Sequence, residues 1–305
     1  MNKQNYIDQK NLCIQLCIQK QQDYYSKLVD GNKDSQRMLF KVANELLDKK
    51  QEQILPIHAD AKELADEFNN YYIDKIKKIR QSIPTDSIVP ECCKRKFEGA
   101  LLTDFSPTNE NEINDILKKS GLKTSAEDPI PSKVLKSLLE TSIEMWKVLI
   151  NKSFEEGTFD GVKCSVIEPL LKKQDLDPEI RKNYRPVSKL PFFSKLTERL
   201  VLHRLESHMD EHALHESTQF GYKQHHSTET MMRGMMDEIL KGFDENKATI
   251  VIFLDLSAAF DTIDFDKVLE ILREEIGITG NALKWFRSFL TGRKQCVKIE
   301  DQYFD

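Results

Sequence analysis

Apolar residues recur at helical spacing through most of the chain. In the segment 1–83 they lie among Lys, Gln and Glu, as Leu64, Phe68 and Ile76 do. This spacing is typical of helices with polar surfaces, so we expect a helical arm here. Shorter stripes predict further helices over 109–119, 132–150, 196–205, 227–243, 264–276 and 281–291.

Several residues at the ends of these stripes predict where the helices begin and end. Ser227 and Asp264 are N-cap residue types placed just before a stripe, and Gly277 and Gly292 follow one. The helix over 227–243 carries a row of methionines, and Met most often fills gaps in a core. We therefore expect this row to be buried.

One run has the pattern of a strand rather than a helix. The residues Thr249–Leu254 (TIVIFL) are a Thr followed by five apolar residues, which predicts a strand buried on both faces, inside a sheet covered by helices. Asp255 follows directly. A carboxylate at the end of a buried strand is costly unless water, a metal or a cation meets it. Asp255 is therefore either a Mg²⁺ ligand or the cap of the next turn.

Charge is unevenly distributed although the net charge is only −5. The segment 163–204 has ten basic and five acidic side chains. It contains short extended pieces around Pro169, which predict a basic hairpin that could bind anions. Two ordinary solvated faces explain the same charges.

The composition excludes several classes of protein. Charged residues make up 31% of the chain and the mean hydropathy is −0.52, while no apolar run approaches the roughly 18 residues of a membrane-spanning helix. The six cysteines form no CxxC pair, and the chain starts without a secretory signal pattern. We expect reduced thiols and an intracellular protein, in the nucleus or cytoplasm.

Five motifs in order resemble the reverse transcriptases of non-LTR (LINE-type, jockey-like) retrotransposons. They are PLLKK, NYRPVS, HSTET, LDLSAAFD and ALKWFRSFLTGR, and the run DPIPSKVLK precedes them. The resemblance implies an α+β fold with the fingers and first part of the palm of a right-hand polymerase. It divides the chain into a helical arm or linker over 1–83, a helical lead-in over 84–160 and an incomplete polymerase domain over 161–305.

The family's activity is RNA-directed DNA synthesis, with an RNA template, a DNA primer, dNTPs and Mg²⁺ as partners. Carried over by motif, Asp255 is the catalytic metal ligand and Leu256 contributes to the metal site. The expected nucleotide-binding residues are Lys172, Lys173, Arg185, Ser257, Ala258, Ala259 and Phe260, of which Phe260 screens the sugar 2′ position. The expected nucleic-acid contacts are Lys182, Lys189 and Lys223.

Three departures from the family pattern weaken the expectation of activity. The Gly that usually precedes the HSTET motif is absent from 222–226, and Glu168 stands where a neutral residue is common. The sequence also contains no Asp-Asp dipeptide, whereas the family's second acidic motif supplies the remaining metal ligands. We therefore expect an incomplete, inactive piece, or alternatively a non-catalytic RNA- or protein-binding remnant. A zinc site at His208 and His212 is a weaker alternative than solvated helix histidines.

Overall fold

The computed structural model shows a mixed helix-and-sheet protein, which agrees with the expected α+β class. The chain forms two compact units, Met1–Ile54 and Leu55–Asp305. The residues that the structure describes are 3–33, 35–46, 54–83, 96–119, 128, 132–159, 163–256, 258–300 and 302–304.

The first unit consists of two helices, α1 (Lys3–Asp30) and α2 (Gln36–Leu46). The apolar side chains of α1 are poorly covered, and Leu12 and Leu16 are 49% and 51% exposed. In α2, Val42 is buried. Both helices lie in the segment where the spacing of apolar residues predicts helices.

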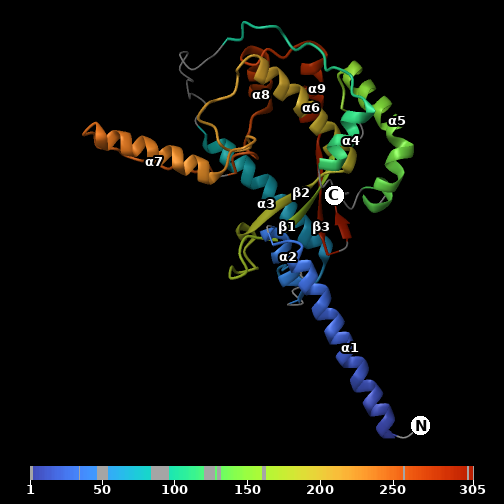
Figure 1. Cartoon of the computed structure of the whole chain (residues 1–305). Helices are drawn as coiled ribbons and strands as arrows, with labels where there is room; N and C mark the ends of the chain where they lie inside the picture. The colour runs from blue at the N-terminus through green and yellow to red at the C-terminus, as the bar shows by residue number, and fades with distance from the viewer. Residues whose placement is uncertain are drawn as a thin grey trace. The chain divides into compact units, whose positions relative to one another are not determined.

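The second unit contains a four-stranded sheet in the order β2–β1–β3–β4 (Figure 1). The strand β1 (Cys164–Leu171) pairs antiparallel with β2 (Tyr184–Lys189), and this pair is the predicted basic hairpin. On its other side, β1 pairs in parallel with β3 (Lys294–Ile299). The short strand β4 (Gln302–Phe304) completes the sheet, antiparallel to β3.

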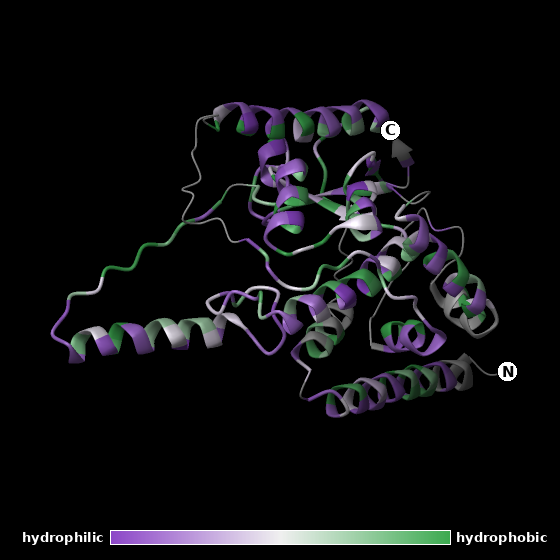
Figure 2. Ribbon diagram, turned by 90° about the horizontal axis from the view of Figure 1, so that it is seen from above, coloured by the Kyte–Doolittle hydropathy of each residue, from purple (hydrophilic) through white to green (hydrophobic). Residues whose placement is uncertain are grey.

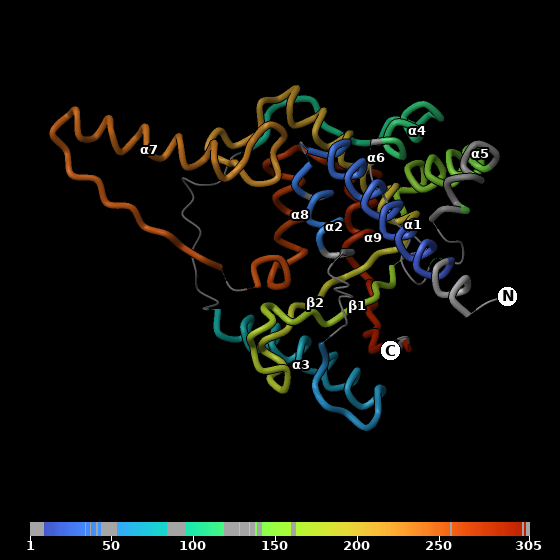
Figure 3. Tube along the Cα trace, turned by 60° about the horizontal axis from the view of Figure 1, so that its bottom comes forward, coloured from blue at the N-terminus to red at the C-terminus, as the bar shows by residue number. Residues whose placement is uncertain are grey.

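One face of the sheet is covered by α3 (Ala61–Ser82), as Figure 3 shows. The helix begins at Asp60, whose carboxylate accepts a hydrogen bond from the Lys62 amide at 2.8 Å. Phe68 packs edge-on against Tyr184 of β2, with 5.0 Å between ring centroids. Thus α3 belongs to the second unit, although the sequence groups it with the other helices of the segment 1–83. The buried residues of this cluster are Leu64, Ala65, Phe68, Tyr72, Ile167, Tyr184, Val297 and Ile299.

A second core lies among four helices of the same unit. These are α4 (Glu110–Lys119), α5 (Ser132–Glu156), α6 (Phe192–Glu211) and α9 (Gly280–Leu290), and all four lie where apolar stripes predict helices. Aromatic rings fill the centre, where Trp285 is 1% exposed. The rings in contact with it are Phe105, Phe159, Phe286 and Phe289.

The predicted helix ends are confirmed. Ser227 caps α7 (Thr228–Asp244) through a capping box. Asp264 caps α8 (Phe265–Glu274) by accepting two backbone hydrogen bonds. Gly277 follows α8 with a φ of 81°, a conformation that favours glycine.

The prediction of a buried central strand at 249–254 is wrong. The segment leaves α7 as an extended stretch that pairs with no strand among the described residues, and Figure 2 shows its apolar residues away from the cores. Ile252 and Leu254 are 75% and 87% exposed. A strand is buried only where neighbouring strands pair with it and helices cover it, and the described sheet uses other segments.

The prediction that the methionines fill a core is also wrong. No residue of α7 is buried, and Met232 and Met236 are 52% and 47% exposed. The amphipathic pattern forms the helix, but its apolar side is only partly covered. Both wrong predictions have the same cause. The pattern of apolar residues indicates which face of a helix or strand is suited to burial, but it does not show whether another element covers that face.

Candidate functional site

The basic hairpin brings several of the predicted nucleotide-binding residues together. The backbone amide of Lys172 donates to the carbonyl of Asn183 at 2.9 Å, and its ammonium donates to the carbonyl of Lys182 at 2.7 Å. Arg185 lies opposite Leu170 in the register. Partial burial, and then the charges of Lys75, Arg185 and Lys182, lower the pKa of Lys172. The charges of these three residues therefore act on the Lys172 ammonium.

The helix α3 is fastened to the loop of this hairpin. Arg181 forms an ion pair with Glu67 of α3, and its guanidinium lies 5.2 Å from the centroid of the Phe68 ring. Within the loop, the Tyr184 hydroxyl donates to the carbonyl of Pro178 at 3.0 Å. These contacts give the basic loop a fixed position on α3, the helix that also carries Lys75.

A pocket of about 450 Å³ lies between α3 and the sheet. Its lining includes three cations from α3, namely Lys75, Lys77 and Arg80, and one carboxylate, Asp261. The remaining lining is apolar or carries hydroxyl and amide groups. The pocket is therefore suited to an anionic ligand that also has an apolar part.

The motif after the expected strand forms a turn that reaches this pocket. Ala258 has a φ of 54°, and its carbonyl accepts hydrogen bonds from the amides of Asp261 and Thr262 at 3.0 and 3.1 Å. Arg80 of α3 donates to the carbonyl of Ile263 at 2.6 Å. The turn is thereby held against the C-terminal end of α3.

Phe260 of this motif contacts the segment 222–226 before α7, which lacks the glycine usual in the family. Its ring packs edge-on against Tyr222 with 6.0 Å between centroids, and both rings are largely exposed. Two sequence motifs therefore lie side by side. Ala259, next to Phe260, is exposed as well.

The expected metal ligands are exposed, and among the described residues they do not form part of a metal site. Asp255 and Leu256 are both exposed, and Asp255 neither caps a turn nor forms an ion pair among the described residues. Within the described part of the chain, no group of three His, Cys, Asp or Glu side chains could hold a metal. Ser257 lies outside the described residues.

The three lysines that are expected to contact nucleic acid differ in their surroundings. Lys182 is exposed on the hairpin loop. Lys189 is paired with Glu168, which lies 4.0 Å from Lys298 as well. Lys223 is in the turn before α7, where its carbonyl accepts from the His226 amide at 3.2 Å. Glu168 therefore neutralises part of the basic surface on this side of the hairpin.

The alternative zinc site does not form. The ring of His208 is buried and lies 2.7 Å from the carbonyl of Ile276. The Nδ1 atom of His212 is 3.0 Å from the carbonyl of His208. Both rings pack on Phe97, so these histidines pack α6 against neighbouring segments.

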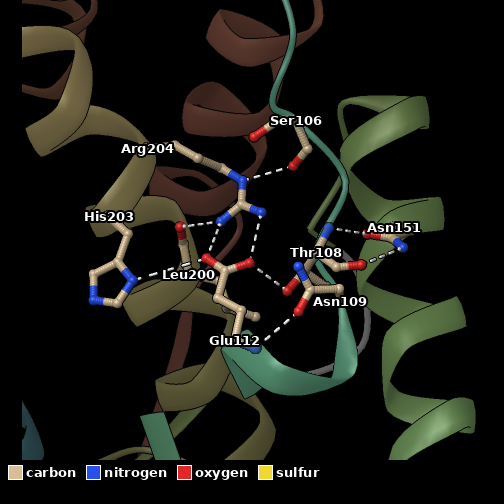
Figure 4. A network of polar contacts seen from close by, with 8 residues as sticks. All are labelled: Ser106, Thr108, Asn109, Glu112, Asn151, Leu200, His203 and Arg204. Carbon is tan, nitrogen blue, oxygen red and sulfur yellow. Dashed lines mark hydrogen bonds and ion pairs between the residues drawn. The ribbon is translucent and has the colours of Figure 1, made fainter. Parts of the chain in front are cut away.

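Away from the pocket, a polar network joins α4, α5 and α6 (Figure 4). Arg204 donates to both carboxylate oxygens of Glu112, and Thr108 donates to the same carboxylate at 2.7 Å. Burial disfavours ionised Glu112, but the hydrogen bonds from Arg204 and Thr108 outweigh it and lower its pKa. By contrast, burial raises the pKa of Glu198 on α6.

Sequence reasoning missed four residues of the candidate site: Tyr72, Lys75, Arg80 and Tyr222. The basic residues between 75 and 80 stand out in the sequence, because they interrupt an apolar stripe. Nothing in the spacing indicates that this helix packs on the hairpin more than 80 residues later. The positive charge of these α3 residues was therefore visible in the sequence. The packing of α3 on the hairpin was not.

No helix among the described residues is both long enough and apolar enough to cross a membrane.

Comparison with known proteins gives consistent matches. The sequence model of the family described as reverse transcriptase (RNA-dependent DNA polymerase) matches residues 171–304. The chain is 27% identical over 200 residues to the probable RNA-directed DNA polymerase from transposon BS of Drosophila melanogaster, covering 65% of this chain and 22% of that protein. It is 24% identical over 192 residues to the RNA-directed DNA polymerase from mobile element jockey of the same organism, covering 61% and 21%.

A third relative is the probable RNA-directed DNA polymerase from transposon X-element of Drosophila melanogaster. The identity is 29% over 201 residues, which cover 65% of this chain and 21% of the relative. The chain thus spans about a fifth of the length of these curated relatives, which it matches over 22%, 21% and 21% of their lengths.

Proposed function

We propose that over residues 171–304 the chain belongs to the reverse transcriptases of non-LTR retrotransposons and takes part in RNA-directed DNA synthesis. The observation that carries this proposal is the basic hairpin, in which the Lys172 ammonium donates to the carbonyl of Lys182 and Arg185 lies on the paired strand. Such basic side chains suit the phosphates of a nucleotide or an RNA strand.

The hairpin would act as the fingers of a right-hand polymerase. Arg185 can hold two phosphate oxygens through its planar guanidinium, whereas Lys172 and Lys173 act as point charges. Lys182, Lys189 and Lys223 would contact the backbone of the RNA. In this assignment, the chain binds an RNA template, a DNA primer and a dNTP.

The turn after Leu254 would form the nucleotide-facing part of the palm. Phe260, exposed and edge-on to Tyr222, would screen the sugar 2′ position. The backbone amides of 257–259 would face the triphosphate. We assign 161–305 to fingers and palm and 84–160 to the helical lead-in, while the segment 1–83 contributes α3 to the basic surface.

The family uses Mg²⁺, and the residues present fit it in part. The exposed carboxylate of Asp255 and the Leu256 carbonyl can supply ligands, and a bound Mg²⁺ ion would polarise phosphoryl oxygens. Among the described residues, no group of three His, Cys, Asp or Glu side chains that could hold a metal includes Asp255. The chain's own contribution is therefore to bind phosphate and to position the nucleotide.

A second candidate function is supported by the same observation. Without a second acidic group beside Asp255, the chain could act as a non-catalytic RNA- or protein-binding remnant of such an element. The hairpin cluster would then still bind RNA, while the exposed apolar residues of α7 and 249–254 would serve a protein partner. The two candidates differ in whether Asp255 affects a reaction.

RNA binding as a function of salt tests the phosphate-binding role that both share. With three to five phosphate contacts, at about 0.7 per contact for single strands, log Kobs should fall against log salt with a slope of roughly −2 to −4. Lys172→Ala combined with Arg185→Ala should flatten this slope. Lys118→Ala combined with Lys267→Ala removes the same charge from exposed positions on α4 and α8 and should leave it nearly unchanged. Equal slopes in the two double variants would contradict the assignment.

A further inference from the structure

The helix α1 contains a stretch that is exposed along its whole length. Every residue from 9 to 21 is exposed. Four of them are large aliphatic residues that are between 47% and 51% exposed, namely Leu12, Ile14, Leu16 and Ile18. A helix that is apolar on several sides is usually buried. This stretch is therefore suited to contact with another molecule.

Two cysteines lie within the stretch, one helical turn apart. Cys13 and Cys17 are both free and exposed. Residues four apart in a helix lie on the same face, with about 5–6 Å between their Cβ atoms. A cysteine that serves only as a small apolar residue is usually buried, so packing does not explain this pair. Its spacing, with three residues between the cysteines, is one that zinc-binding cysteine pairs use.

The two cysteines belong to a seam that is complementary to itself. Lys10, Cys13, Cys17 and Lys20 follow one another at spacings of three, four and three residues, which is the spacing of residues that meet in a two-helix coiled coil. The sequence QKNLCIQLCIQKQ over 9–21 also has the same residue classes in both directions from Gln15. A second copy of α1, parallel or antiparallel, therefore places two thiols against two thiols.

One copy of the chain supplies half of a tetrahedral metal site. Structural Zn²⁺ has four ligands, and four cysteine sulfurs are a common set. Within the described residues, no group of three His, Cys, Asp or Glu side chains could hold a metal, so Cys13 and Cys17 have no third ligand there. A two-fold interface presents the same residues from both copies. A second copy thus supplies the two missing thiols.

The lysines at the ends of the seam match the charge of such a site. Four thiolates around one Zn²⁺ form a dianionic centre, and Lys10 and Lys20 of both copies place positive charges beside it. In a pair of α1 helices without metal, the seam lysines of the two copies would face and repel each other. The seam is therefore suited to pairing around a metal and poorly suited to pairing without one.

We propose that Cys13 and Cys17 of two copies of the chain bind one Zn²⁺ ion and thereby join the copies along α1. Each thiol releases its proton when it binds the metal. The aliphatic residues on either side of the seam pack around the metal and exclude water. The proposal concerns α1 alone and depends neither on the basic hairpin nor on Asp255.

Sedimentation velocity of the full chain in EDTA and in added Zn²⁺, with a phosphine reductant in both, tests the proposal. Zinc should strengthen dimerisation more than about a hundredfold, and elemental analysis should find one zinc in each dimer. Cys13→Ser combined with Cys17→Ser should abolish both effects. Cys92→Ser combined with Cys93→Ser removes the same number of thiols from elsewhere in the sequence and should leave both unchanged.

Cobalt(II) reports the ligand set directly. With Co²⁺ in place of Zn²⁺, the wild-type chain should show the absorption of tetrahedral thiolate coordination. The Cys13 and Cys17 double variant should lack this absorption and keep the circular dichroism spectrum of the wild type, because both side chains are exposed.

A charge-reversed pair tests the role of the seam lysines. Lys10→Glu combined with Lys20→Glu should weaken zinc binding about tenfold, because carboxylates beside a dianionic centre repel it. Lys118→Glu combined with Lys267→Glu makes the same charge change at exposed positions of α4 and α8 and should have little effect.

Four results would overturn the proposal: no zinc-dependent dimer, one zinc bound to each monomer, equal zinc binding in the two serine double variants, or a wild-type dimer that persists in EDTA. RNA binding in EDTA separates this proposal from the proposed function. The Cys13 and Cys17 double variant should keep the salt slope of RNA binding, and the hairpin double variant should keep the zinc-dependent dimer.

Discussion

The guanidinium of Arg204 forms a two-pronged ion pair with the carboxylate of Glu112. The Nη1–Oε1 and Nη2–Oε2 distances are 2.8 and 3.0 Å, and the Arg204 side chain is 8% exposed. The same arginine donates to the carbonyls of Ser106 and Leu200 at 2.7 Å. This pair therefore fixes α6 on α4 and on the segment before it.

Breaking the pair should cost more stability than an exposed pair would. Arg204→Ala leaves the partly buried Glu112 without its cation, and we expect a loss of about 3 kcal/mol in the free energy of unfolding. The measurement is urea denaturation followed by circular dichroism. Lys147→Ala, which removes a more exposed ion pair with Glu110, is the control and should give a clearly smaller loss. Equal losses would mean that the Arg204 pair has no special role.

The contribution of Glu112 should depend on pH in one direction. Its folded-state pKa is lowered, so its stabilising effect is present above the ordinary carboxyl pKa of about 4.3. That effect is lost as the pH falls through the lowered folded-state pKa. The difference in urea midpoint between wild type and Glu112→Gln should thus be full at neutral pH and shrink in the acid range. A difference that grows on acidification would contradict the sign.

Local signals in the sequence predicted local structure well, and tertiary partners less well. Ser227, Asp264 and Gly277 mark helix ends because capping involves only neighbouring residues. The hairpin of β1 and β2 is likewise local, and so its basic cluster could be foreseen. The exposure of 249–254 was not predictable, because the burial of a strand depends on strands from elsewhere in the chain. The contact of α3 with the hairpin was missed for the same reason.

The exposed apolar segment should limit solubility more than stability. Ile252 and Leu254 are mostly exposed, and an unpaired apolar strand is a template for aggregation. We expect the Ile252→Lys and Leu254→Lys double variant to scatter less light at high concentration, with an unchanged melting temperature. Val166→Lys, at a fully buried position of β1, is the control and should unfold the sheet. A double variant that unfolds would show that 249–254 is buried in solution.

The measurement that tests the functional account most directly is template-dependent DNA synthesis on an RNA template. The 305-residue chain should give no incorporation with Mg²⁺ or Mn²⁺ above a heat-killed control, because Asp255 is the one assigned metal ligand with a carboxylate. Joined to a segment that carries the family's Asp-Asp motif, it should incorporate dNTPs and lose this activity in Asp255→Asn. Synthesis by the joined protein that survives Asp255→Asn, or synthesis by the 305-residue chain alone, would contradict the account.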